Sequence, residues 1–274
     1  MDKLKVIYCP VPKAGSTSWK YFLASIIQNG TLPNNGKVNI HDYQYLRSIG
    51  IRRLSEFSSF EAEKRIKLYF KFTSVRHPMD RLVSTYEDKI IGDSQYKPNL
   101  KWYIIKRYGH RMISRTKGRH HQTLFQDRPI KDVHLVGDDS NQIEFVEFLQ
   151  YVVESFFSTQ LIPDVHTLST TRLCRPCSLK YDYIAKLETI EQDFNNIILR
   201  LSNSSDQHQM VFPKYNVKAT FRSNLENESK KFKPLDIQDY YRSVPINIID
   251  KIRSIYGDDM KIFSYSWRNK WHKI

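Results

Sequence analysis

Residues 9–19 read Cys-Pro-Val-Pro-Lys-Ala-Gly-Ser-Thr-Ser-Trp and are the most informative part of the chain. It follows a short apolar run, Leu4 to Tyr8, that is typical of a buried strand. It leads into an amphipathic pattern from Trp19 to Ile27 that is typical of a helix. A strand, a tight turn holding Gly15 and a helix start together form an anion site, because free backbone N–H groups and the helix dipole favour negative charge. Lys13 adds a positive charge on a flexible stem.

The turn differs from the phosphate loop of nucleotide triphosphatases. That loop needs G-x-x-x-x-G-K-[ST], whereas Lys13 stands two residues before the turn's glycine. The order Pro-Lys-x-Gly-Ser-Thr resembles instead the loop that holds the 5′-phosphosulfate end of PAPS (3′-phosphoadenylyl sulfate) in sulfotransferases. An ordinary strand-to-helix turn with a Ser or Thr cap is the alternative. The expected binding residues of this loop are Val11, Pro12, Lys13, Ala14, Gly15, Ser16 and Thr17.

A second element of the same kind spans residues 69–86. Tyr69 to Val75 alternates as a strand does, and Pro78 suits the first position of a helix. Arg76 therefore lies at a strand end and Ser84 about two turns into the helix. An arginine fork and a hydroxyl so placed can bind one phosphate, and the spacing resembles the 3′-phosphate site of sulfotransferases. A surface ion pair is the alternative for Arg76.

The chain as a whole resembles the carbohydrate sulfotransferase family that includes the HNK-1 sulfotransferase and the chondroitin and dermatan 4-O-sulfotransferases. Two departures stand out: Ser16-Thr17-Ser18 stands where the family has Cys or a small residue followed by Thr-Asn, and His166-Thr167 stands where the family has His-Trp. The second departure removes the family's tryptophan, whose indole is a natural platform for a sugar ring, so the acceptor surface is not defined by the resemblance. The resemblance is carried by Val11-Pro12-Lys13, Arg76-His77-Pro78, Asp80 to Tyr86, Asp88-Lys89, the 143–153 helix, Leu173 to Cys177 and Tyr181 to Thr189.

The resemblance and the alternation of strands with helices imply an α/β chain with a P-loop-like sulfotransferase fold. Its central sheet is expected to be mainly parallel and flanked by helices, with ligands at the strand ends. A length of 274 residues with 40% hydrophobic residues suits one catalytic domain over 1–274. The expected elements are strands at 4–9, 69–75 and 181–187, and helices at 16–28, 59–68, 78–91, 99–115, 145–156, from Thr189 to about Leu201, and from Pro245 to a stop at Gly257.

The family resemblance implies transfer of a sulfuryl group from PAPS to a sugar hydroxyl of a glycosaminoglycan or glycoprotein glycan, with PAP as the product. The 4-hydroxyl of GalNAc in chondroitin or dermatan is the first candidate acceptor, and a terminal glucuronic acid is the second. Lys13 would neutralise charge on the leaving phosphate, so no metal is required. In related sulfotransferases the general base lies between the two cofactor motifs, just after a strand, and His41 after Val38-Asn39-Ile40 occupies that place. His166, at the family's His-Trp position, is the other candidate, with His41 favoured. A structural histidine is the alternative for each.

The net charge of +14, from 43 Lys and Arg against 29 Asp and Glu, favours polyanionic ligands. Part of the excess lies between Lys101 and His121, which is either a wall of the acceptor groove or a solvated surface. An acidic glycan is the expected partner. Nucleic acid is not expected, because the chain shows neither an RNA-type aromatic signature nor zinc-finger spacing.

Two other classes share parts of this pattern. A P-loop kinase of small molecules also binds phosphate at a helix start that follows a strand and a turn. The Walker lysine and an obvious carboxylate for magnesium are, however, missing from this sequence. A non-catalytic binder of sulfated glycans would keep the basic groove without using the nucleotide.

Three cysteines are present, and Cys174 and Cys177 form a C-x-x-C pair. With His166 they would supply three zinc ligands but not a fourth, so a local disulfide is the favoured interpretation, with Cys9 as a buried thiol.

The resemblance implies a Golgi lumen location. No stretch approaches the roughly 20 apolar residues of a membrane span, and the start lacks a signal peptide. A membrane is therefore expected only through an anchor absent from this chain. Sequons at Asn29, Asn203 and Asn227 are compatible with a lumenal protein.

Overall fold

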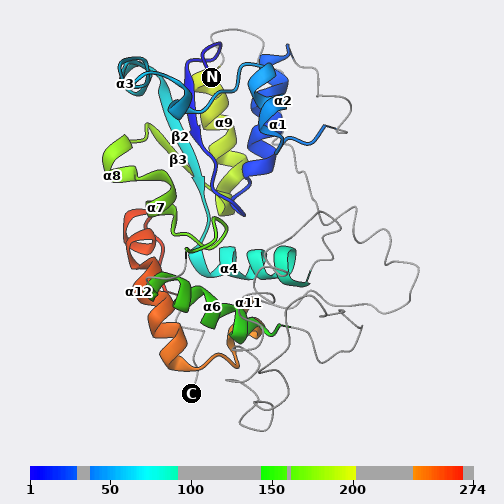
Figure 1. The fold of residues 1–274 in the computed structure, drawn as a ribbon, viewed down its shortest axis with the longest axis vertical. Helices are drawn as coiled ribbons and strands as arrows, with labels where there is room; N and C mark the ends of the chain where they lie inside the picture. The colour runs from blue at the N-terminus through cyan, green and yellow to red at the C-terminus, as the bar shows by residue number, and fades with distance from the viewer. Residues whose placement is uncertain (30–37, 92–142, 159–161, 202–236, 268–274) are drawn as a thin grey trace, which may run out of the picture. The chain divides into compact units, whose positions relative to one another are not determined.

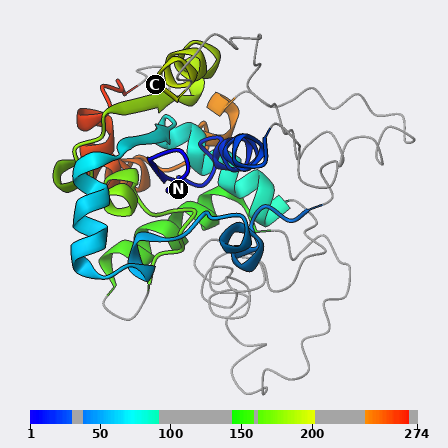
Figure 2. The same ribbon diagram turned by 90° about the horizontal axis from the view of Figure 1, so that it is seen from above.

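The computed structural model describes residues 1–29, 38–91, 143–158, 162–201 and 237–267 (Figure 1; Figure 2). Within these ranges the chain forms two compact units. The first comprises the described residues of Met1–Arg76 and Thr170–Lys233, and the second those of His77–Ser169 and Pro234–Ile274. The predicted helix at 99–115, the basic segment 101–121 and the sequons at Asn203 and Asn227 lie outside the described residues. The single catalytic domain stays a prediction.

The first unit contains a parallel three-stranded sheet, which confirms the predicted α/β class. Its strands are β1 (Val6–Cys9), β2 (Phe70–Val75) and β3 (Tyr183–Lys186), in the order β1-β2-β3. Cys9 pairs with Thr73 and Val75 pairs with Lys186 in register. All three strands run in the same direction, so their carboxyl ends lie along one edge of the sheet. Ligands bind beyond this edge in open α/β sheets.

Helices α1 (Ser16–Ile27) and α9 (Ile190–Leu201) lie beside the sheet (Figure 1). Their apolar faces meet β2 in an aromatic core in which Trp19, Phe72 and Phe194 are fully buried. The Trp19 and Phe72 rings lie edge to face with centroids 4.9 Å apart, an arrangement that adds about 0.5–1.5 kcal/mol beyond area burial. The core therefore fixes α1 against the sheet. The unit's other helices are α2 (Tyr43–Ser48), the 3-10 turn Leu54–Glu56, α3 (Ser59–Leu68), α7 (Thr170–Cys174), α8 (Pro176–Leu179) and the 3-10 turn Leu187–Thr189.

The second unit is helical in its described part. The predicted helix at 145–156 is confirmed as α6 (Phe145–Phe157). Its residues Phe145, Phe148 and Leu149 are buried in one cluster with residues of α4 (Pro78–Tyr86) and α12 (Ile246–Ile262). His77 accepts a hydrogen bond from the Met79 amide at 3.3 Å and so caps α4, with Pro78 at the first helical position as predicted. The elements are α4 (Pro78–Tyr86), the π-helical turn Glu87–Ile91, α6 (Phe145–Phe157), α11 (Ile237–Tyr241) and α12 (Ile246–Ile262).

Two helix ends differ from the sequence prediction. Helix α12 does not stop at Gly257 but continues to Ile262, because Met260 beyond the glycine is buried. A glycine inside a helix costs about 1 kcal/mol relative to alanine, and burying a methionine contributes about 1.5–3 kcal/mol, so packing outweighs propensity. Helix α9 begins at Ile190, directly after a 3-10 turn, and not at Thr189, whose hydroxyl donates to the Asp193 carboxylate at 2.7 Å.

The disulfide differs from the predicted local pair. Cys9, at the end of β1, is bonded to Cys174, at the end of α7, across 165 residues of sequence. Cys177 is a free, exposed thiol. The physical reason is the left-handed backbone of Arg175, which separates the end of α7 from the start of α8 at Pro176. Cys174 is therefore buried against Val11 and Ala14, whereas Cys177 lies on the other helix.

A buried polar network joins α4 to α12 in the second unit. Arg81 and Asp259 are only 2% and 1% exposed, and the Arg81 guanidinium nitrogen lies 4.0 Å from an Asp259 carboxylate oxygen. Arg81 also donates to the carbonyls of His166 and Leu168, and Tyr256 donates to the carbonyl of Thr167. These bonds hold the segment around His166 in place.

Among the described residues, none of the helices is both long and apolar enough to span a membrane. Within the same ranges, His, Cys, Asp and Glu side chains do not form a group of three or more that could hold a metal ion.

Candidate anion site at the start of helix α1

The loop between β1 and α1 has two residues in the left-handed region. Gly15, the residue before α1, has φ 80°, which glycine adopts at no steric cost. Lys13 has φ 66°, a conformation that costs a lysine of order 1 kcal/mol and that clusters at ligand sites. The Ala14 amide donates to the Val11 carbonyl at 3.3 Å and closes the turn. The loop is thus a compact turn that leads directly into the helix.

The first turn of α1 is open to a ligand within the described part of the chain. No side chain there caps this helix, and no acidic residue lies in its first turn. The alternative of an ordinary Ser or Thr cap is therefore wrong. Ser16 and Thr17 are partly exposed, whereas Val11 and Ala14 are fully buried and anchor the loop. Amide groups without a capping partner, together with the positive end of the helix dipole, favour an anion here.

Arg76 is hydrogen-bonded to the backbone of this loop. It directly follows β2 and is partly exposed, and its guanidinium donates to the Lys13 carbonyl at 3.3 Å. The parallel pairing of β1 with β2 explains the contact, because it brings the residues that follow each strand to the same edge. Two cationic residues predicted for opposite ends of one nucleotide are therefore neighbours in the first unit.

His41 lies beside the first turns of the same helix. Its Nε2 is 3.3 Å from the Thr17 hydroxyl, and its Nδ1 is 3.5 Å from the Lys20 ammonium. The backbone around it is fixed: Tyr21 donates to the Val38 carbonyl at 2.9 Å, and Ile40 is 1% exposed in a small cluster with α1. The structure thus places the predicted His41 against a residue of the predicted anion loop.

Lys20 is the residue of this site that the sequence reasoning missed. It lies one helical turn after Thr17, a spacing that puts the two side chains on one face of α1. Burial, and then the charge of Arg53, lower the pKa of Lys20. The helical spacing from Thr17 was the available signal. The lowered pKa of Lys20 reflects mainly the desolvation of its ammonium group, and the nearby charge of Arg53 adds a positive potential that suits an anionic ligand.

Ser84 and His166 belong to the second unit. Ser84 is partly exposed on α4. The His166 ring nitrogen Nδ1 is 2.8 Å from the Asp164 carboxylate, which also accepts from the His166 amide at 2.8 Å. Burial alone would raise the pKa of Asp164, but these hydrogen bonds lower it. Asp164 was missed as well, although a carboxylate two residues before a histidine is a visible signal.

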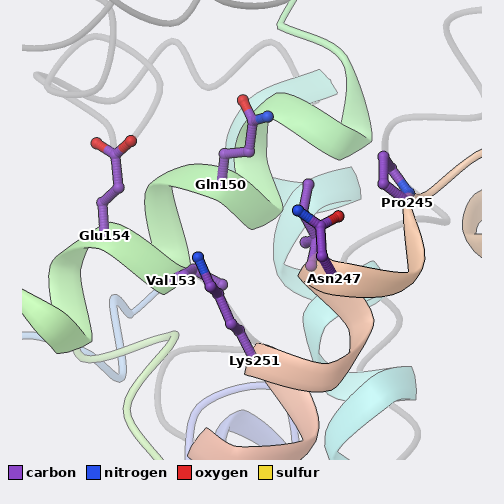
Figure 3. Close-up of a pocket in the computed structure, with 7 residues that line it drawn as sticks. Gln150, Val153, Glu154, Pro245, Asn247 and Lys251 are labelled. Atoms are coloured by element: carbon purple, nitrogen blue, oxygen red, sulfur yellow. The ribbon is translucent and has the colours of Figure 1, made fainter.

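A cavity of about 380 Å³ opens in the second unit between α6 and the start of α12 (Figure 3). In Figure 3, Gln150 and Glu154 extend from α6, and Asn247 and Lys251 extend from α12. None of the predicted site residues lines it. The geometry of the anion loop, and not this cavity, therefore defines the candidate site.

Comparison with known proteins agrees with this geometry. A family model described as the sulfotransferase family matches residues 1–266, so the chain belongs to the sulfotransferase family. Carbohydrate sulfotransferase 10 from Pongo abelii is 29% identical over 274 residues, which are 96% of this chain and 65% of the relative. The Homo sapiens protein of the same name is 28% identical with the same coverage.

A second relative has a different name. Carbohydrate sulfotransferase 11 from Rattus norvegicus is 27% identical over 265 residues, 97% of this chain and 66% of the relative. The chain therefore spans about 65% of the length of these curated relatives. No solved structure matches the chain.

Proposed function

We propose that this protein is a carbohydrate O-sulfotransferase that takes its sulfuryl group from PAPS. Membership of the sulfotransferase family supports the reaction class, and the names of the relatives support a carbohydrate acceptor. The observation that carries the proposal is the uncapped start of α1, with Lys13 in its loop and Arg76 bonded to the Lys13 carbonyl. This arrangement provides positive charge and amide donors for a phosphosulfate group.

In the proposed reaction the acceptor oxygen attacks sulfur in line with the leaving phosphate. The Lys13 ammonium offsets the charge that grows on that phosphate, and the amides of the 14–17 loop orient the 5′ end. As in phosphoryl transfer, catalysis is then mostly positioning and charge stabilisation. Arg76 and Ser84 hold the 3′-phosphate, which distinguishes the nucleotide from AMP. His41 and His166 are the candidate groups for removing the acceptor proton.

The proposed acceptor is an acidic glycan of the glycosaminoglycan type. The net charge of +14 supports it, because such a field attracts polyanions. The 4-hydroxyl of GalNAc in chondroitin or dermatan is the first candidate, and a terminal glucuronic acid is the second. A Golgi lumen location belongs to the same proposal. The disulfide between Cys9 and Cys174 supports it, since such bonds persist in oxidising compartments.

Two measurements test the proposal. Calorimetric titration with PAP, AMP and ATP identifies the nucleotide, and PAP is expected to bind most tightly. A preference for ATP would instead indicate a kinase. Transfer of ³⁵S from labelled PAPS to a panel of desulfated polysaccharides, followed by disaccharide mapping, identifies the acceptor. Binding of sulfated glycans with neither PAP binding nor transfer would indicate a non-catalytic glycan binder.

A further inference from the structure

Both nitrogens of the His41 ring have a polar neighbour in α1. Nδ1 lies 3.5 Å from the Lys20 ammonium and Nε2 lies 3.3 Å from the Thr17 hydroxyl. An ammonium group has donors only and no acceptor. Nδ1 must therefore accept from Lys20, and the proton of the neutral ring lies on Nε2. In this tautomer the Nε2–H group donates toward Thr17.

The surrounding residues keep the ring in this position. The His41 amide donates to the Asn39 side chain at 3.0 Å, and Ile40 is buried beside α1. The ring partners lie three residues apart on one helix, so a single rigid element carries both. A histidine that served as a base here would gain a positive charge directly beside Lys20. In addition, its Nε2 lone pair is not available while that nitrogen carries the proton.

We propose that His41 acts in the anion site as a neutral hydrogen-bond donor, held in its Nε2–H tautomer by Lys20, and not as the general base. This inference rests on the proposed function. The Nε2–H group lies 3.3 Å from the hydroxyl of Thr17 in the proposed phosphosulfate loop, and an anionic oxygen of the bound sulfate or phosphate group is proposed to replace that hydroxyl as its acceptor. Lys20 is then a positioning residue, which acts through the ring and not on the ligand. The proton of the acceptor hydroxyl is left to another group, for which His166 is the remaining candidate.

The tautomer can be measured on the unmodified protein. In ¹⁵N-histidine spectra, assigned by comparison with His41→Gln, Nδ1 of His41 is expected to show the shift of an unprotonated nitrogen and Nε2 that of a protonated one. A proton on Nδ1, or on both nitrogens, would overturn the assignment. Lys20→Met is expected to shift the population toward a mixture of tautomers, and Lys20→Arg, which keeps a donor, is expected to preserve it.

Activity separates a donor from a base. The amide nitrogen of glutamine can take the place of Nε2–H, but glutamine has no basic nitrogen. His41→Gln is therefore expected to keep kcat within about tenfold of the unmodified protein, whereas His41→Ala loses about 10²–10³-fold, as for one oxyanion donor. Equal loss in both variants, with both folded by circular dichroism, would show that a base is required. Failure of the unmodified protein to bind PAP would overturn the proposed function, while the ring tautomer would remain a separate result.

Discussion

The disulfide between Cys9 and Cys174 joins the end of strand β1 to the end of helix α7 across 165 residues of sequence. Cys9 lies four residues before Lys13. Cys174 is 2% exposed and packs with Val11 and Ala14 of the anion loop. The bond therefore fixes one side of the loop that leads into α1. A covalent link at this place reduces the freedom of the unfolded chain and keeps the loop beside the sheet.

The first prediction concerns this bond. Cys174→Ser is expected to lower the free energy of unfolding by about 2–4 kcal/mol, because a long loop in the unfolded state is no longer closed. Cys177→Ser is the matched control and is expected to change little, since Cys177 is an exposed free thiol. Denaturant unfolding measures both. A thiol titration of the denatured, unreduced protein should find one reactive thiol, and three would contradict the pairing.

Lys13→Ala is expected to weaken PAP binding by about 10–100-fold, because a hydrogen bond to a charged group contributes about 1.5–3 kcal/mol. Calorimetric titration measures the change. Lys67→Ala removes a charge of the same sign from an exposed pair with Glu63 on α3 and serves as the control. Equal affinity in the Lys13 variant and the control would place the nucleotide elsewhere.

Arg76→Ala is expected to reduce discrimination between PAP and AMP, because the two ligands differ only in the 3′-phosphate that Arg76 is proposed to hold. The ratio of their dissociation constants should fall about tenfold or more, while AMP affinity changes less. Arg76→Lys keeps the charge but loses the planar fork, so an intermediate ratio is expected. A ratio unchanged in both variants would remove Arg76 from the 3′-phosphate site.

Arg81→Met is expected to destabilise the protein by about 3–5 kcal/mol, because it leaves the buried Asp259 carboxylate without its cation. The added change Asp259→Asn should recover part of the loss. Arg253→Met is the control, since Arg253 pairs with Asp250 on the surface of α12 and such pairs contribute at most about 1 kcal/mol. Denaturant unfolding compares the variants. Similar losses for Arg81 and Arg253 would contradict the importance of the buried network.

Asp2 predicts a pH dependence of stability. A hydrogen bond from Arg65 is the main cause that lowers its pKa from 3.8 to about 2, and Tyr69 also donates to it. The carboxylate is thus stabilised by folding above its unfolded pKa, and this stability is lost as the pH falls through the folded pKa. The side chain is 48% exposed, so solvent screening limits the effect to about 1 kcal/mol or less.

Unfolding measured at about pH 5 and about pH 2 should show a smaller deficit of Asp2→Asn at the lower pH, because about half of the folded protein carries a protonated Asp2 at pH 2. The exposed Asp258→Asn is the control and should show little dependence of this kind. A deficit of Asp2→Asn that is equal at both pH values would contradict the ion pair as its cause.

Most elements of the fold were predictable from local pattern. The apolar run before Cys9, the alternation of residues 69–75 and Pro78 each predicted an element that the structure contains. These signals are local, because hydrophobic spacing and turn residues act within a few positions along the chain. The candidate anion site rests on the same kind of signal, since the strand, the tight turn and the helix start that form it are contiguous in sequence.

Which residues far apart in sequence come into contact depended on packing. Cys174 has Cys177 three residues away but is bonded to Cys9, because the left-handed Arg175 places the near pair on two helices and the core brings the far pair together. Gly257 is typical of a helix end, yet α12 continues to Ile262 because Met260 beyond the glycine is buried.

His41 shows the same contrast between local sequence signals and contacts set by packing within the candidate site. Its position between the two predicted phosphate-binding motifs was visible in the chain, but its ring partners on α1 were not. Local sequence thus set which elements form, whereas the three-dimensional packing chose the contacts between them, because the energy of burying two surfaces is known only once the chain has brought them together.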